Sequence, residues 1–102
     1  PADMSLPVLF LGDELSAAGF RLGGIEARTP PAGEEAAYFE QARQETPFVL
    51  VTAEVAERLP PALLARALGA GRPLVAVLPD VRGRMAPPDL AAALRRQLGM
   101  EA

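Results

Sequence analysis

The stretch FLGDELSAAGFRLGGIEAR, residues 10–28, decides how the chain is interpreted, because it holds a strand end, a short helix and a second strand in succession. The apolar run of residues 6–11 has strand length and ends at a glycine. Asp13 then is a typical helix N-cap, and the next apolar positions share one helical face: Leu15, Ala18, Gly19 and Leu22. Gly23-Gly24 ends this helix, and residues 25–28 form the second strand.

Outward from this unit, strand and helix patterns keep alternating along the chain. Further strands are predicted over residues 48–51 and 74–78, and a helix over 34–45. Thr52 is a candidate N-cap for the helix after the third strand. The pair Pro60-Pro61 interrupts that helix and predicts either a kink or two short helices, the second beginning with a proline.

The order β-α-β-α-β-α-β-α predicts a small α/β domain with an open parallel four-stranded sheet. The commonest arrangement is flavodoxin-like or receiver-like, with strand order 2-1-3-4 and the fifth strand absent. We expect one domain over residues 1–102, with a core over about 1–80 and a C-terminal helix over about 87–99. Leu90, Leu94 and Leu98 form one stripe of that helix.

The residue types that the chain lacks exclude several kinds of site. It has no Cys, no His and no Lys, so all ten basic residues are Arg. Thiol chemistry, the usual zinc sites, Schiff bases and lysine-assisted phosphate sites are therefore excluded. The net charge of −3 and the 5% aromatic content do not suit a nucleic-acid surface. No apolar run reaches the ~18–20 residues of a membrane span.

The glycines of the opening stretch match neither the dinucleotide fingerprint nor the P-loop. Gly12 ends a strand, whereas Gly19 lies inside the helix, where it costs about 1 kcal/mol relative to Ala and predicts a close approach to the sheet or to another chain. A working phosphoacceptor receiver is excluded as well, because Thr52 follows the third strand in place of an acceptor Asp. We predict no catalytic, cofactor-binding or metal-binding residue.

The segment GFRLGGI, residues 19–25, closely resembles the G-F-R-L-A-G-[IV] segment near the start of the F subunit of V/A-type rotary ATPases. Three further segments are similar to that family, in the same order: FVLVTAEVAERL (48–59), RPLVAVLPD (72–80) and the ending LRRQLGMEA (94–102). The resemblance covers essentially the whole chain. The chain departs from the family pattern in lacking Lys, in Pro60-Pro61 and in the proline-rich approach to the last helix.

The resemblance implies a non-catalytic rotor component of an ion-translocating ATPase. Such a protein sits on the central stalk, binds the coiled-coil shaft (the D subunit), and through it couples the catalytic A/B head to the membrane ring. It would be cytoplasmic and peripheral to the membrane, without inserting into it, and would bind no nucleic acid and no cofactor. The alternative is a stand-alone degenerate receiver-like module that binds other proteins.

Two segments are candidate partner interfaces on this interpretation. Phe20 and Arg21 form the first, although core packing is the alternative for Phe20. The last helix forms the second, with residues Leu90, Leu94, Arg95, Arg96 and Leu98. Its leucine stripe either docks on the shaft, with the arginines pairing with acidic residues of the partner, or covers the fourth strand.

Overall fold

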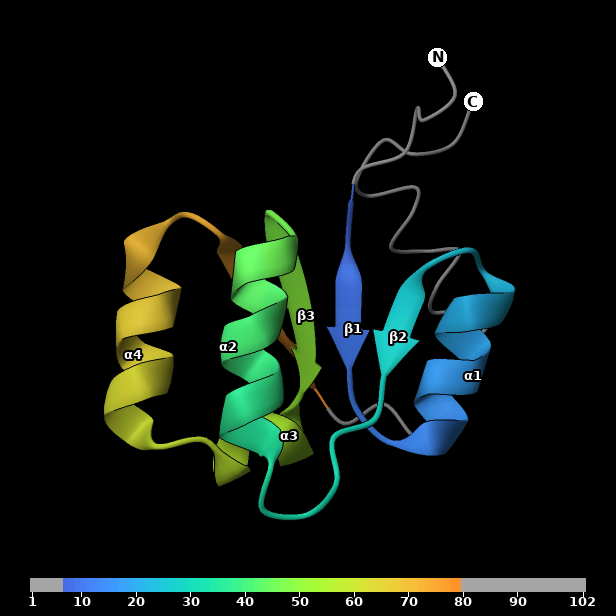
Figure 1. Cartoon of the computed structure of the whole chain (residues 1–102), viewed down its shortest axis with the longest axis horizontal. Coiled ribbons are helices and arrows are strands. Elements are labelled where there is room, and N and C mark those ends of the chain that lie inside the picture. The colour runs from blue at the N-terminus through green and yellow to red at the C-terminus, as the bar shows by residue number, and fades with distance from the viewer. Residues whose placement is uncertain (1–6, 80–102) are drawn as a thin grey trace.

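A computed structural model describes residues 7–79, whose four strands form one parallel sheet (Figure 1). The elements are, in chain order, β1 (Leu9–Leu11), α1 (Glu14–Leu22), β2 (Glu26–Arg28), α2 (Glu35–Glu45), β3 (Phe48–Thr52), α3 (Ala53–Arg58), α4 (Pro61–Ala70) and β4 (Leu74–Leu78). The strand order is β2-β1-β3-β4, which confirms the predicted α/β class and the order 2-1-3-4. The predicted helix over 87–99 lies outside the described residues.

The helix starts follow the predicted local chemistry. Asp13 caps α1, because its carboxylate accepts a hydrogen bond from the backbone N–H of Ser16 at 3.0 Å. Thr52 caps α3 in the same way, and its hydroxyl accepts from the N–H of Val55 at 3.2 Å. The proline pair yields the second of the two predicted outcomes, since α3 ends at Arg58 and α4 begins with Pro61.

The face that α1 turns toward the sheet differs from the one that the spacing of its leucines predicts. Ala17 and Phe20 are buried, whereas Leu15 and Leu22 are 68% and 79% exposed. The reason is Phe20, whose ring stacks on that of Phe10 with centroids 4.2 Å apart. A large aromatic side chain gains more from burial than a leucine does, so it fixes the rotation of the helix.

The two faces of the sheet are covered unequally. Helices α2, α3 and α4 pack on one face, which we call the closed face, against Leu9, Leu11, Val49, Val51 and Val75. The second face, which we call the open face, is covered within residues 7–79 by α1, which packs over β1 and β2. Its cluster contains Val8, Phe10, Ala17, Phe20, Ile25, Ala27 and Leu50. Successive residues of one strand thus alternate between the two faces.

Candidate functional site

The carboxyl ends of the strands, where open α/β sheets bind ligands, carry groups that serve the fold. The oxygens of Asp13 and Thr52 accept the capping hydrogen bonds of α1 and α3. Gly12, between β1 and α1, has no room for a side chain, because an added Cβ would lie 2.6 Å from Cγ2 of Thr52. Among the described residues, no group of three or more His, Cys, Asp or Glu side chains could hold a metal ion.

The outer face of α1 carries the two most exposed large apolar residues of the part of the chain that the structure describes. Leu15 and Leu22 are seven residues apart, and the small exposed residue Ala18 lies between them. Positions 15, 18 and 22 have the spacing of a heptad seam, the pattern with which helices pack against each other in coiled coils. We call these three residues the α1 seam. Their arrangement fits a helical partner.

The predicted interface pair, Phe20 and Arg21, is divided between the inside and the outside of the domain. Phe20 is 1% exposed and belongs to the core beneath α1, as in the core alternative. Arg21 is exposed beside the α1 seam, and its Nη2 donates a hydrogen bond to the carbonyl oxygen of Ala27 at 2.8 Å. This bond ties the outer side of α1 to β2, so Arg21 holds the seam in place and presents a positive charge next to it.

The other predicted interface residues, Leu90, Leu94, Arg95, Arg96 and Leu98, lie outside the described residues. Sequence reasoning placed Leu15 and Leu22 on the inner face of α1 and so missed the seam. The sequence of α1 held a clue to this exposed face. Its nine residues carry large apolar side chains on two different sides of the helix, the leucine stripe on one and Phe20 on the other. A surface helix buries only one of its sides against the core, so the second apolar side is left exposed.

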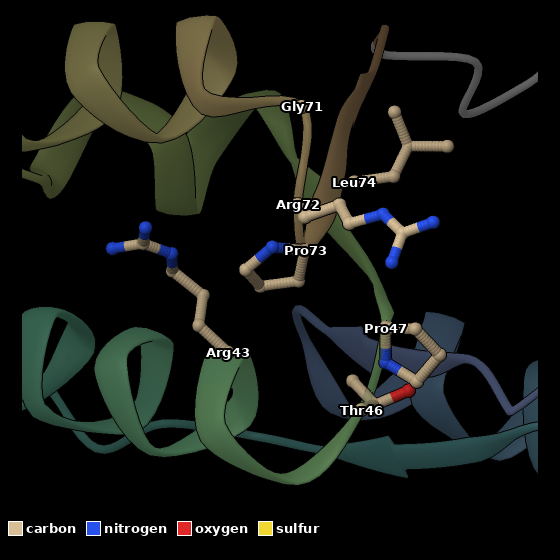
Figure 2. Close-up of a pocket in the computed structure, with 7 residues that line it drawn as sticks. All are labelled: Arg43, Thr46, Pro47, Gly71, Arg72, Pro73 and Leu74. Carbon is tan, nitrogen blue, oxygen red and sulfur yellow. The ribbon is translucent and has the colours of Figure 1, made fainter.

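A hollow of about 580 Å³ opens near the amino ends of β3 and β4, between the end of α2 and the turn from α4 to β4 (Figure 2). Arg43 and Arg72 both line it, but Figure 2 shows their guanidinium groups pointing in different directions, with Pro73 between them. Nη1 of Arg43 forms an ion pair with Oε1 of Glu40 at 3.1 Å, and the guanidinium group lies over the ring of Phe39. Its Nε is buried and has no hydrogen-bond partner. The hollow therefore lacks the convergent polar groups of a ligand site.

An ion pair joins the edge strand β2 to helix α2. Nη2 of Arg28 lies 2.6 Å from Oε1 of Glu45 and 2.9 Å from a carboxylate oxygen of Glu26. The hydrogen bond from Arg28 lowers the pKa of Glu45 below its ordinary value, and the bond to Glu45 raises the pKa of Arg28. Both groups are therefore charged at neutral pH, and the pair is a structural clamp at the rim of the closed face.

The chain is similar to a known protein family over most of its length. The family model described as ATP synthase (F/14-kDa) subunit matches residues 8–94. The matched range contains every strand and helix of the described structure. No curated protein matches the chain at a significant level. Within the described residues, no helix is long and apolar enough to cross a membrane.

Proposed function

Since the chain belongs to the ATP synthase (F/14-kDa) subunit family, which is the F subunit of V/A-type ATPases, we propose that it is a non-catalytic rotor component that binds the coiled-coil shaft, the D subunit. The family match over residues 8–94 is the observation that carries this proposal. As part of the central stalk, the chain would link the catalytic A/B head to the membrane ring without inserting into the membrane. Its place would be cytoplasmic and peripheral.

The chemistry of the domain supports a role without catalysis. The polar side chains at the ligand-binding edge of the sheet, Asp13 and Thr52, cap helices. The chain has no His, Cys or Lys, the residues that most often act as bases and nucleophiles near neutral pH. A protein that transmits torque needs a docking surface, and the exposed leucines of α1 support such a role.

The α1 seam is the docking surface that we assign to the shaft. A coiled coil presents helices, and a second helix packs best when small and large apolar residues alternate along the contact. Leu15 and Leu22 offer the large side chains, and Ala18 allows close approach between them. Arg21 stands beside them to pair with an acidic residue on the shaft. Phe20 supports this surface from below through its stacking on Phe10.

The experiment is co-expression with the D subunit of the same organism, followed by gel filtration with light scattering. We expect a stable complex with one copy of each chain. If both proteins are folded and elute separately at tens of micromolar, the rotor role is wrong, and the stand-alone receiver-like module becomes the better proposal.

A variant of the seam tests the docking surface separately. Leu22→Glu places a charge on a side chain that is 79% exposed, so the fold is retained while the apolar contact is lost. We expect affinity for the shaft to fall by at least about tenfold, which corresponds to roughly 1.4 kcal/mol. Leu68→Glu is the matched control, because Leu68 is also exposed but lies on α4, on the closed face. Equal binding by both variants would remove the seam from the interface.

A further inference from the structure

The two charged residues of α1 stand at opposite ends of the α1 seam and on the same side of it. Glu14 is the first residue of the helix, Arg21 lies in its last turn, and both are exposed. Residues seven apart in a helix differ in direction by only about 20°, so Glu14 and Arg21 form a row along the helix. Leu15 and Leu22 form a second row beside it, by the same spacing. The apolar row therefore has a negative charge beside one end and a positive charge beside the other.

These two rows complement themselves when two copies of α1 meet in opposite directions. A two-fold axis at Ala18 places each row across from the same row of the second copy, turned end for end. Leu15 then faces Leu22, and Glu14 faces Arg21, each with an axial offset of about 1.5 Å, the rise of one residue. By symmetry each contact forms twice. A parallel pair would put the charged rows on opposite sides of the contact, so the charges favour the antiparallel arrangement.

The surroundings of the seam also favour such a contact. The seam lies on the side of α1 opposite to Ala17 and Phe20, which are buried against the sheet, so pairing leaves the core unchanged. Ala18 is small and exposed at the centre of the seam, where two helices would approach most closely. Arg21 is already fixed by its hydrogen bond to the carbonyl oxygen of Ala27 at 2.8 Å, so less side-chain entropy is lost when it pairs.

We propose that two copies of the chain pair antiparallel through their α1 seams when the shaft is absent. Leu15 of each copy packs on Leu22 of the other, and Glu14 pairs with Arg21. The inference rests on the proposed function in assigning the same seam to the shaft, so the two contacts exclude each other. The second copy covers the leucines of the free chain and gives way to the shaft.

The size of the seam sets the strength of this pairing. Three residues on a nine-residue helix bury less than the ~1,200 Å² of a stable interface. We therefore expect a weak dimer, with a dissociation constant of about 0.1 mM. Sedimentation equilibrium of the isolated chain measures it. The average mass should rise toward that of a dimer between about 10 µM and 1 mM. A mass that stays that of one chain over this range would overturn the proposal.

Reversal of the charges tests the antiparallel arrangement. Glu14→Arg and Arg21→Glu should each weaken the dimer at least about tenfold, because like charges then face each other at both contacts. An equimolar mixture of the two variants should associate like the natural chain, because both contacts of a mixed pair join opposite charges. The matched control is Glu57→Arg, the same charge change at an exposed position of α3, which should leave association unchanged. A mixture that associates as weakly as its components contradicts the proposal.

A crosslink provides a measurement that does not depend on charge. The natural chain has no cysteine, and Ala18→Cys would place two thiols at the two-fold axis. Under mild copper-catalysed air oxidation, we expect this variant to form a disulfide-linked dimer at least about tenfold faster than Ala65→Cys, because a disulfide needs Cα atoms within roughly 7 Å. Ala65 is also exposed but lies on α4, on the closed face. Equal rates for the two variants would contradict the pairing of the seams.

Addition of the D subunit to the concentrated natural chain separates this inference from the proposed function. Light scattering should show that a complex with one copy of each chain replaces the dimer. A chain that is monomeric by itself and still forms this complex refutes the pairing and leaves the proposed function intact. A dimer that persists beside a folded, unbound D subunit refutes the proposed function instead. A complex that holds two copies of the chain would show that pairing and shaft binding use different surfaces, and so refute the shared seam.

Discussion

The closed face and the open face of the sheet do different work in this domain. The closed face buries Phe39, Ala42, Val55 and Leu63 from three helices against the strands. The open face has one helix within the described residues, and that helix carries exposed leucines on its outer side. The apolar side chains of the closed-face cluster are covered by the helices of that face. On the open face, the leucines of α1 remain exposed and are available for further contacts. The closed face therefore holds the larger part of the buried core, and under the proposed function the open face is the one that binds the shaft.

The largest expected effect comes from removing an aromatic ring from the closed face. Phe39 of α2 is 0% exposed, and Phe39→Ala should lower the free energy of unfolding by about 3–5 kcal/mol, since it deletes buried area and leaves a cavity. Leu22→Ala, on the outer side of α1, should change it by less than about 0.5 kcal/mol. Urea unfolding followed by circular dichroism measures both. A large loss of stability for Leu22→Ala would show that the side chain of Leu22 is already covered in the isolated protein.

An intermediate effect is expected where the two faces meet, at Gly12. A Cβ there would lie 2.8 Å from Cε2 of Phe10 and 2.6 Å from Cγ2 of Thr52, and would also clash with Cζ of Phe10. Phe10 belongs to the open-face cluster, and Thr52 caps α3 on the closed face. Gly12→Ala should therefore cost about 1–3 kcal/mol by overpacking, as measured by urea unfolding.

Gly69→Ala is the matched control for Gly12→Ala. Nothing lies within 4 Å of a Cβ at Gly69, which is inside helix α4. The exchange of glycine for alanine in an open helical position should stabilise the protein by up to about 1 kcal/mol. If Gly12→Ala unfolds at the same urea concentration as the natural chain, the junction between the faces is looser than its contacts indicate.

The features that the sequence predicted correctly depend on short stretches of chain. The caps at Asp13 and Thr52 and the helix start at Pro61 each involve residues within one turn. The strand order followed from the alternation of helix and strand, because right-handed crossovers leave few topologies. The family resemblance is confirmed by the match over residues 8–94.

The features that the sequence did not predict depend on neighbours that are distant in the chain. The rotation of α1 is decided by the stacking of Phe20 on Phe10, and periodicity alone cannot choose between Phe20 and the leucine stripe. Arg28 and Glu45 are 17 residues apart, and only the parallel pairing of β2 beside β1 brings them together. The α1 seam was missed for the same reason, since its exposure depends on what the opposite side of the helix contacts.

The smallest expected effect is at the rim of the closed face, where Arg28 clamps β2 to α2. Because the hydrogen bond from Arg28 lowers the pKa of Glu45, the folded state binds this proton less readily than the unfolded chain does. The pair therefore stabilises the fold above the ordinary pKa of about 4.5, and this contribution is lost as the pH falls through the lower folded value. Arg28 stays charged throughout, because its pKa is raised. Glu45→Gln should unfold at a slightly lower urea concentration at pH 7, and the difference should shrink in acid.

The control for this last comparison is Glu57→Gln, which removes an exposed carboxylate of α3. Its unfolding midpoint should stay close to that of the natural chain at every pH, since a solvated surface charge contributes little. High salt should also reduce the effect of Glu45→Gln, because the clamp is screened at the surface. A Glu45→Gln curve that coincides with the natural one from pH 7 to the acid limit would mean that the ion pair between Arg28 and Glu45 adds nothing to stability.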